Sequence, residues 1–373
     1  MPLGSAAQSR RLTMVITELD VGGAEKAFVR VAIGLNNLGW DVRAVSLRDA
    51  GPLASLLEAA NIEVTALKAG GLFDIRAIWR LRQELLRKPA HAMLTFLHQA
   101  NLVGRIAGRV SGVRRIVCGI RVADRRLVVR LPERLTKSLV DCYVSVSQSV
   151  GDLHQNICHI DPTRMAVIPN GVDLEAIDVA LPVIRSEIGC GPDDQIIVCV
   201  GRLSRQKAPF DTLEAFRLML TQFPNLKRQA RLLFIGEGEL RSELQRQVDR
   251  LGLQSSVQLL GWRPDAWSLM KSADALVLAS HWEGLPNVIL EAQAAGLPVV
   301  ATAVDGSREL IQDELTGRLV PRGDTKAIAT ALGEILQNKA AASLMSRNAR
   351  SHVEENYRWG RCIEQYDQVL GSP

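Results

Sequence analysis

The sequence has few aromatic residues and no long apolar run. Phe, Trp and Tyr together make up 4% of its 373 residues. No apolar stretch reaches the roughly 18 residues that a membrane-spanning helix needs, and residues 1–9 lack the apolar core of a signal peptide. We therefore expect a cytoplasmic protein, with a peripheral position on the inner face of a membrane as the alternative.

Motifs for metals, disulfides and dinucleotides are also missing. The six cysteines have no Cys-x-x-Cys spacing and mostly lie in apolar runs, so we expect reduced core residues rather than a disulfide or zinc framework. There is no Asp-x-Asp motif. No Gly-x-Gly-x-x-Gly follows the first apolar run, residues 12–18, which argues against a nicotinamide-dependent oxidoreductase.

The composition is that of a soluble globular protein with an uneven charge. The chain is long enough for two domains. Residues 1–175 carry 23 Lys and Arg against 16 Asp and Glu, a difference of +7, whereas the remainder carries 22 against 24, a difference of −2. Residues 101–140, here called the basic belt, hold Arg105, Arg109, Arg114, Arg115, Arg121, Arg125, Arg126, Arg130, Arg134 and Lys137.

The basic belt favours an anionic surface or a phosphate-bearing partner. Because no zinc-finger or RNA-recognition motif accompanies the charge, we expect no nucleic-acid partner. Within the belt, Leu127, Leu131, Leu135 and Leu139 recur every four residues. This pattern predicts either a helix packed on a sheet or a helix that docks on anionic lipid headgroups, and we favour the core interpretation.

Apolar runs alternate with helical patterns along the chain. We expect strands at residues 11–18, 42–47, 62–67 and 92–97, with helices at 53–60 and 75–87 between them. The alternation restarts with a strand at 196–200, after a linker that runs to about residue 181. It predicts two doubly wound α/β domains with parallel sheets.

Residues 281–302 join two buried strands through a loop and a helix. We expect Pro286 at the first helical position, where its missing N–H costs nothing. The amides of Asn287 and Val288 would then point out of the helix start, which suits an anion. Glu283 in the loop and Glu291 in the second turn would both face the carboxyl edge of the sheet, where such folds bind ligands.

The segment from Glu283 to Ala292 resembles the signature of retaining, nucleotide-sugar-dependent glycosyltransferases of family 4, which have the GT-B fold. The resemblance covers nearly the whole chain after Arg11 and is densest at residues 198–320. It implies two Rossmann-like domains that face each other across a cleft. Residues 1–175 would bind the acceptor and residues 176–355 the donor, with the last helix, 356–373, crossing back to the first domain.

Five further segments carry the same resemblance. The Gly22-Gly23 turn follows the first strand, and His98 follows the fourth. Gly201 to Lys207 resembles the family's Gly-Arg-Leu…Lys-Gly element, with Ala208 where glycine is usual. Glycine turns at Gly236 and at Gly261 resemble those that hold the base.

The resemblance implies a role for each candidate residue. Arg202 and Lys207 would hold the departing diphosphate, Glu283 and His98 the donor sugar, and Glu291 the ribose. The candidate catalytic residues are His98, Arg202, Lys207 and Glu283. The donor site would add Gly23, Gly236, Trp262, Arg263, Gly284, Leu285, Asn287, Val288 and Glu291, and the acceptor site Gly22, Gly23 and Arg121.

We therefore expect metal-independent, cofactor-free transfer of a hexosyl or N-acetylhexosaminyl group, with retention. The donor would be a nucleoside-diphosphate sugar, and UDP is favoured. The acceptor would be a glycan or lipid-linked molecule, as in cell-surface polysaccharide synthesis. A GT-B-fold sugar-nucleotide epimerase and a non-catalytic binding protein remain as alternatives. Glu291→Ala and Lys207→Ala are each expected to abolish transfer and to leave thermal unfolding nearly unchanged.

Overall fold

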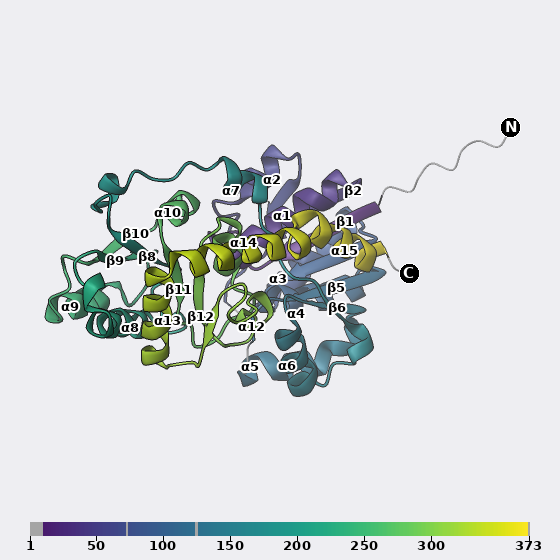
Figure 1. Ribbon diagram of the computed structural model, residues 1–373. Coiled ribbons are helices and arrows are strands. Elements are labelled where there is room, and N and C mark those ends of the chain that lie inside the picture. Colours follow the sequence, from purple (N-terminus) through teal and green to yellow (C-terminus); the bar gives the residue numbers. More distant parts are fainter. Residues whose placement is uncertain (1–9, 72–73, 124–125, 372–373) are drawn as a thin grey trace. The chain divides into compact units, whose positions relative to one another are not determined.

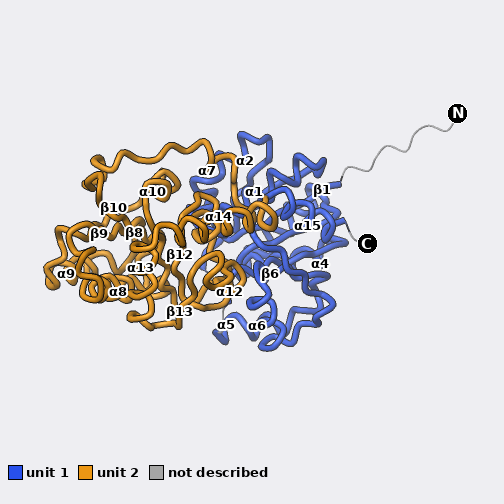
Figure 2. The backbone as a smooth tube through the Cα atoms, in the orientation of Figure 1, with its two compact units in different colours: residues 1–170, 359–373 blue, residues 171–358 orange. Residues whose placement is uncertain are grey.

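The computed structural model describes residues 10–71, 74–123 and 126–371, and the chain divides into two compact units (Figures 1 and 2). The first unit contains the chain up to residue 170 together with residues 359–373, and the second contains residues 171–358. The sequence predicted the boundary at residue 175. Arg125 of the basic belt lies outside the described residues.

The first unit is built on a parallel sheet of seven strands in the order β3-β2-β1-β4-β5-β6-β7. The central strands β1 and β4 are buried on both faces, apart from the first two residues of β1, as their apolar runs predict, whereas the edge strands β3 and β7 are partly exposed. Their bounds are β1 Arg10–Ile16, β2 Trp40–Ser46, β3 Glu63–Ala66, β4 Ala92–Phe96, β5 Arg115–Ile120, β6 Cys142–Ser145 and β7 Met165–Val167. The strand order reverses between β1 and β4.

Helices cover both faces of this sheet. One core contains residues of α1 and α2 together with Tyr366 and Leu370 of α15, and the other contains residues of α3, α4 and α6. Tyr366 is fully buried against Phe96, and Trp40 donates a hydrogen bond to Asp367 at 2.7 Å. The helices are α1 Gly23–Asn37, α2 Ala54–Ala59, α3 Arg76–Arg87, α4 His98–Val110, α5 Leu127–Thr136, α6 Gln148–Cys158 and α15 Trp359–Gly371, with 3-10 turns at Lys137–Leu139 and Pro162–Arg164.

The second unit has a parallel sheet of six strands in the order β10-β9-β8-β11-β12-β13. Its strands are β8 Gln195–Val200, β9 Ala230–Ile235, β10 Val257–Gly261, β11 Ala275–Leu278, β12 Val299–Thr302 and β13 Arg318–Val320. Its helices are α7 Leu174–Val179, α8 Pro209–Gln222, α9 Arg241–Arg250, α10 Ala266–Ser272, α11 Asn287–Ala294, α12 Ser307–Leu310, α13 Thr325–Gln337 and α14 Lys339–Asn356, with 3-10 turns at Arg185–Ile188 and Pro224–Leu226. The order reverses between β8 and β11.

The structure overturns the core interpretation of the leucine repeat. α5 does form, but Leu127, Leu131 and Leu135 are exposed, because the opposite face of α5 packs on the unit. Among the described residues, none of the helices combines the length and the apolar character needed to cross a bilayer.

Candidate active site

The loops after β8 and β11 meet at the point where the second sheet reverses its strand order. β8 and β11 are direct neighbours, and Arg202 and Lys207 follow the first strand as Glu283 follows the second. A parallel doubly wound sheet opens a crevice at such a point, at the carboxyl ends of its strands. The fold therefore brings these candidate residues to one edge, as the sequence predicted.

Lys207 and Glu283 form an ion pair. The Lys207 ammonium lies 2.5 Å from Glu283 Oε1, and Ser280 Oγ donates to the same oxygen at 2.5 Å. The Glu283 side chain is 6% exposed and that of Lys207 21%. A carboxylate this buried needs such charge-assisted donors. The pair fixes an anion and a cation side by side at the switch point.

Backbone contacts tie the two loops together. His281 N donates to Gln206 O at 2.8 Å, and the Gln206 side chain donates to Trp282 O at 3.0 Å. Ala208, at the position where relatives of this motif have glycine, adopts a left-handed conformation with φ +47°. This conformation costs an L-residue about 1–2 kcal/mol. The loop thus has at Ala208 the backbone conformation that a glycine would adopt at no steric cost.

Glycines let neighbouring loops approach closely at this edge. A Cβ on Gly236 would lie 2.1 Å from Gly201 O, and a Cβ on Gly306 would lie 2.2 Å from Gly284 O. Both neighbours are backbone atoms, which cannot rotate away. The packing fixes the path of the chain around Gly284, directly before α11.

Replacing Gly306 by alanine is therefore expected to destabilise the second unit by about 1–3 kcal/mol, because the Gly284 loop must move to admit the methyl group. Gly360→Ala is the control, because a Cβ there has no neighbour within 4 Å and the position lies on the exposed face of α15 in the first unit. That change should stabilise by roughly 0.5–1 kcal/mol. Chemical denaturation measures both variants, and equal stabilities would refute the steric argument.

α11 begins one residue later than predicted. Pro286 is the N-cap with extended backbone, and Asn287 is the first helical residue. Asn287 and Val288 are both half-buried in the first turn of α11, the end of a helix at which backbone N–H groups point outward. Glu291 lies half-buried in the second turn, and Leu285 is buried before the helix. The helix start still suits an anion.

The candidate base-binding residues lie farther along the same edge. β10 is the edge strand and is separated from β8 by β9. Trp262, which directly follows β10, is 59% exposed, and Arg263 forms a bidentate ion pair with Asp265 at 2.6 and 2.8 Å. Gly236 N donates to Gly261 O at 2.7 Å. The backbone amide of Gly236 is thus engaged within the unit.

The first unit repeats the arrangement at its own switch point. β1 and β4 are neighbours, with Gly22 and Gly23 following β1 and His98 following β4. Gly23 opens α1, and His98 is the first residue of α4. Leu97 has φ +74° and ψ 152°, a region that is essentially restricted to glycine and costs about 1–3 kcal/mol. Such strain concentrates at functional sites, and here it orients the start of α4.

Arg121 lies in the interior of the first unit. It is 7% exposed, its guanidinium stacks 4.8 Å from the Phe96 ring, and it donates to Asn170 and, at 3.4 Å, to Tyr366. These contacts join the end of β5 to α15. Binding of an acceptor by Arg121 stays a prediction, and the structure gives this residue a packing role.

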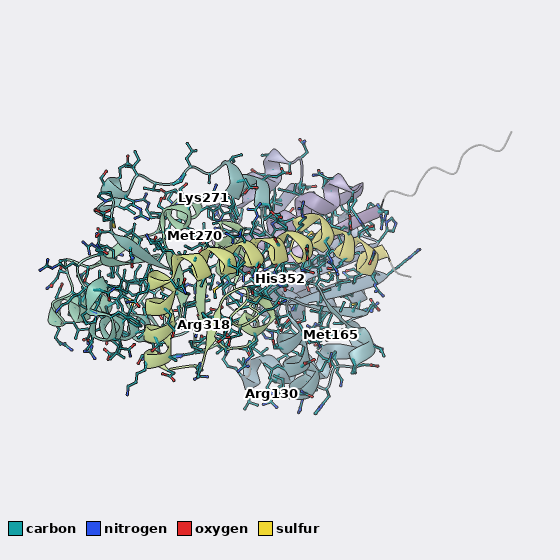
Figure 3. The ribbon with its side chains drawn as sticks, in the orientation of Figure 1. Arg130, Met165, Met270, Lys271, Arg318 and His352 are labelled. Atoms are coloured by element: carbon teal, nitrogen blue, oxygen red, sulfur yellow. The ribbon has the colours of Figure 1, made fainter. Side chains whose placement is uncertain are left out.

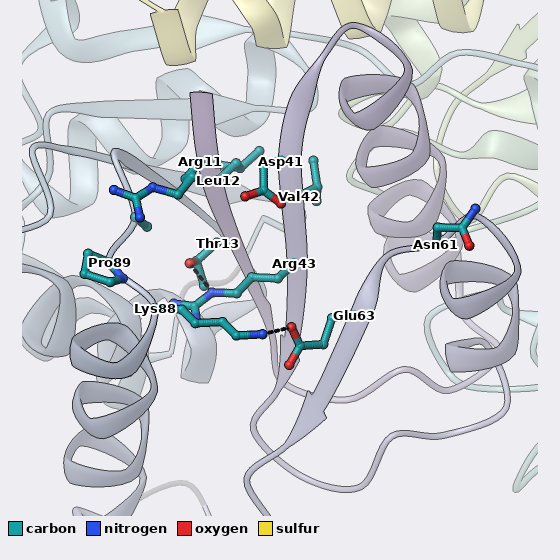
Figure 4. Close-up of a pocket in the computed structure, with 11 residues that line it drawn as sticks. Arg11, Leu12, Thr13, Asp41, Val42, Arg43, Asn61, Glu63, Lys88 and Pro89 are labelled. Carbon is teal, nitrogen blue, oxygen red and sulfur yellow. Dashed lines mark hydrogen bonds and ion pairs between the residues drawn. The ribbon is translucent and has the colours of Figure 1, made fainter. Parts of the chain in front are cut away.

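A cavity of about 320 Å³ opens on the opposite edge of the first sheet, at the amino ends of β1 to β3 (Figure 4). Arg43 donates to Thr13 at 2.8 Å, and Lys88 pairs with Glu63. This hydrogen bond and this ion pair lie in its wall. The cavity is therefore separate from the carboxyl edge that carries the candidate residues.

Sequence reasoning missed the polar residues beneath the site. Ser280 and Thr302 are fully buried, and Thr302 Oγ1 donates to Ser280 O at 2.6 Å. Asp305, with φ +25°, accepts from Glu283 N at 3.3 Å. The sequence does contain one sign of these residues, because Ser280 and Thr302 are hydroxyl residues at the ends of two apolar runs.

Two protein-family models match the chain, one mainly in the first unit and the other in the second. Residues 21–176 match the family model described as Glycosyltransferase Family 4, and residues 181–352 match Glycosyl transferases group 1. The chain is 31% identical over 388 residues to the D-inositol 3-phosphate glycosyltransferase of Actinosynnema mirum, covering 94% of this chain and 92% of that protein.

Another relative is the UDP-Gal:alpha-D-GlcNAc-diphosphoundecaprenol alpha-1,3-galactosyltransferase of Escherichia coli. It is 28% identical over 352 residues, which cover 90% of this chain and 89% of that protein. The fold is similar to that of Anabaena HepE in complex with UDP, with a TM-score of 0.85 at 20% identity, covering 97% of this chain and 100% of that one. HepE has also been solved with UDP-glucose.

Proposed function

The chain belongs to the family 4 glycosyltransferases and is an enzyme of the GT-B type, and from this we propose that it transfers a hexosyl or N-acetylhexosaminyl group from a UDP-sugar with retention of configuration. The observation that carries the proposal is the Lys207–Glu283 pair at the switch point of the second sheet, next to the start of α11. It provides a cation and an anion at the position where this fold binds ligands.

In this proposal the second unit holds the donor. Lys207 and Arg202 neutralise the diphosphate, whose negative charge grows as the bond to the sugar C1 breaks, so they lower the barrier more than they strengthen ground-state binding. The amides at the start of α11 bind the same phosphates. Glu291 accepts from the ribose hydroxyls, and Glu283 shifts from Lys207 toward the hydroxyls of the sugar.

The acceptor hydroxyl attacks C1 from the face that the diphosphate leaves. A diphosphate oxygen takes the proton of the hydroxyl, the new C1–O bond forms on the same face, and UDP departs. The step needs neither a metal ion nor a cofactor in this proposal. His98 and the Gly22-Gly23 turn of the first unit would position the sugar and the acceptor, with the strained Leu97 fixing the direction of His98.

The relatives support the donor and acceptor classes. The Escherichia coli galactosyltransferase is named for a UDP-linked donor and a lipid-linked acceptor, and HepE binds UDP and UDP-glucose. We propose by similarity a UDP-sugar donor and a glycan or lipid-linked acceptor in the assembly of a cell-surface polysaccharide. The sugar and the linkage position are left to experiment.

Nucleotide-sugar binding is the direct test. UDP-glucose, UDP-galactose and UDP-N-acetylglucosamine are each added to the protein, and at least one is expected to raise the melting temperature, since a ligand at a hundred times its Kd stabilises by about 2.7 kcal/mol. With that donor carrying a labelled sugar, a new glycosidic product should form on a lipid-diphosphate acceptor. A labelled free epimer without transfer would support the epimerase alternative, and no stabilisation by any nucleotide sugar would refute the proposal.

A further inference from the structure

The cavity at the amino ends of β1 to β3 is lined by charged side chains that share one face of the sheet. Residues two apart along a strand lie on the same face, and aligned residues of neighbouring strands lie beside each other. The register therefore sets Thr13, Arg43 and Glu63 in one row across the three strands. Arg11 and Asp41 form the next row toward the amino ends. All of them line the cavity.

Charge is unusual at this position. The strands of a parallel sheet are covered on both faces and are normally apolar on both. Two residues farther along the same face, Val15 and Val45 are buried in the core that α3 and α4 share. The cavity of about 320 Å³ lies where this core stops, and Lys88, Pro89 and Ala90 line it from the segment after α3 (Figure 4). Its volume is at the lower end of that of small-molecule sites, about 300–1,000 Å³.

Arg43 holds a positive charge that has no counterion. Its Nε donates to Thr13 Oγ1 at 2.8 Å, and its Nη1 donates to the carbonyl of Glu84 at 3.1 Å. Both acceptors are uncharged, and Nη2 is buried with no hydrogen-bond partner in the described part of the chain. Burial lowers the pKa of Arg43 more than the carboxylates of Glu84, Glu63 and Asp41 raise it. The guanidinium is thus fixed in place while its charge and one donor stay unsatisfied.

Two further cations line the cavity. Arg11 and Asp41 are aligned in register, yet neither side chain forms an ion pair with a described residue. Lys88 pairs with Glu63, and these side chains are 48% and 46% exposed. An ion pair this exposed contributes little to stability, so Lys88 can exchange Glu63 for another anion at small cost. Figure 4 shows Arg43 reaching from β2 toward Lys88.

The directions and chemistry of the lining residues favour one class of ligand. Arg11, Arg43 and Lys88 come from three different segments, and a tetrahedral phosphate accepts from several directions, whereas a carboxylate is planar. The cavity is larger than a bare phosphate, and Asp41 and Asn61 offer partners for hydroxyl groups. Its described lining includes no aromatic side chain on which a nucleobase could stack. These features indicate a phosphorylated sugar or polyol rather than a nucleotide.

We propose that this cavity binds the phosphate monoester of a small sugar or polyol. The phosphate lies against Arg11, Arg43 and Lys88, and the hydroxyl groups face Asp41 and Asn61. The ligand gives Arg43 its counterion, and Lys88 leaves its exposed pair to bind the phosphate. The cavity lies on the sheet edge opposite to the candidate catalytic residues, so the inference goes beyond the proposed function and does not depend on it.

Calorimetric titration of the whole protein with ribose 5-phosphate tests the proposal. UDP is present in excess to fill the proposed donor site, and potassium chloride keeps the ionic strength constant. We expect one ribose 5-phosphate to bind per chain, inorganic phosphate to bind more weakly, and ribose not to bind. The proposal is overturned if neither phosphate compound binds, or if ribose binds as tightly as its phosphate.

Two variants test whether the ligand binds in the cavity. Lys88→Gln and Arg43→Met should each weaken binding of ribose 5-phosphate about tenfold or more, the effect of losing one hydrogen bond to a charged group. The control is Arg114→Gln, which removes an exposed arginine just before β5, at the same sheet edge but outside the cavity. Its affinity should equal that of the unchanged protein. Unchanged affinity in Lys88→Gln, or an equal loss in Arg114→Gln, would overturn the proposal.

Two further variants test the hydroxyl side and the location. Asp41→Asn removes a negative charge that repels both phosphate compounds and an acceptor that only the sugar uses, so the preference for ribose 5-phosphate over inorganic phosphate should fall several-fold. An unchanged preference would overturn the assigned class. Lys207→Ala should bind ribose 5-phosphate as before. Loss of binding in Lys207→Ala but not in Lys88→Gln would place the phosphate at the proposed donor site and overturn the inference.

Discussion

Lys207→Ala is expected to lower kcat for glycosyl transfer by about a thousandfold or more. Removing one fixed charge or donor that stabilises a developing anion costs about 10²–10³ in rate, and Lys207 in addition sets the position of Glu283 through their 2.5 Å contact. Initial rates with a labelled UDP-sugar measure the effect. Lys207→Arg keeps a cation at the site and should retain part of the activity.

The contact with Glu283 also changes the expectation for stability. The sequence suggested that Lys207→Ala would leave unfolding nearly unchanged. In the structure this substitution leaves a carboxylate with 6% exposure whose remaining side-chain donor, within the described part of the second unit, is Ser280. We therefore expect a loss of about 1–3 kcal/mol. Rates must therefore be measured well below the melting temperature of the variant.

Lys271→Ala is the matched control for this experiment. Lys271 belongs to the same unit and donates to the carbonyls of Asp178 and Ala180, both at 2.8 Å (Figure 3). It holds the segment before β8 and has no place in the proposed site. Its replacement should lower stability and leave kcat unchanged. If Lys207→Ala turns over as fast as Lys271→Ala, the role assigned to Lys207 is wrong.

Glu133→Gln is expected to destabilise the first unit by about 3–5 kcal/mol, because it leaves the charge of the fully buried Arg105 without a counterion. Replacing both residues, as Arg105→Met/Glu133→Leu, should cost less than the single change, since no buried charge remains. Calorimetric unfolding of the unchanged protein, the single variants Arg105→Met and Glu133→Leu, and the double variant measures the cycle. A double variant that loses the sum of both single effects would contradict this account.

The same pair predicts a dependence on pH. Burial alone would raise the pKa of Glu133, but the charge of Arg105 and the hydrogen bonds from Arg105 and Tyr143 hold the pKa below its ordinary value. A carboxyl group with a lower pKa in the folded chain stabilises the fold above its unfolded pKa of about 4.3, and this contribution is lost as the pH falls through the folded value. The advantage of the unchanged protein over Glu133→Gln should thus persist at neutral pH, begin to fall below about pH 4 and disappear once the pH has passed the lowered pKa of Glu133.

The positions of the site loops could be predicted from the sequence alone. Apolar runs of strand length alternate with helical patterns, which indicates a parallel sheet, and such a sheet brings the residues after its strands to one edge. His98 directly follows an apolar run, and Gly23, Lys207 and Glu283 lie between such a run and the helix after it or at the start of that helix. The structure accordingly places the first two at one switch point and the last two at the other.

The contacts made at those positions could not be predicted in this way. Lys207 and Glu283 are 76 residues apart, and no local periodicity reports that they bond. The leucine repeat of α5 shows the same limit, since a period of four is equally compatible with an inward and an outward stripe. The direction in which the leucines face is decided by the ion pair between Glu133, on the opposite face of α5, and Arg105, which lies 28 residues earlier in the chain.

The return of α15 to the first unit bears on how the chain folds during synthesis. Residues 171–358 form one uninterrupted unit, whereas the core around Phe96 lacks Tyr366 and Leu370 until the ribosome has made residues 359–371. At about 5–20 residues per second this delay is roughly 10–40 s. During this time the first unit has apolar core surface that α15 does not yet cover, so its core is completed after the chain of the second unit has been made.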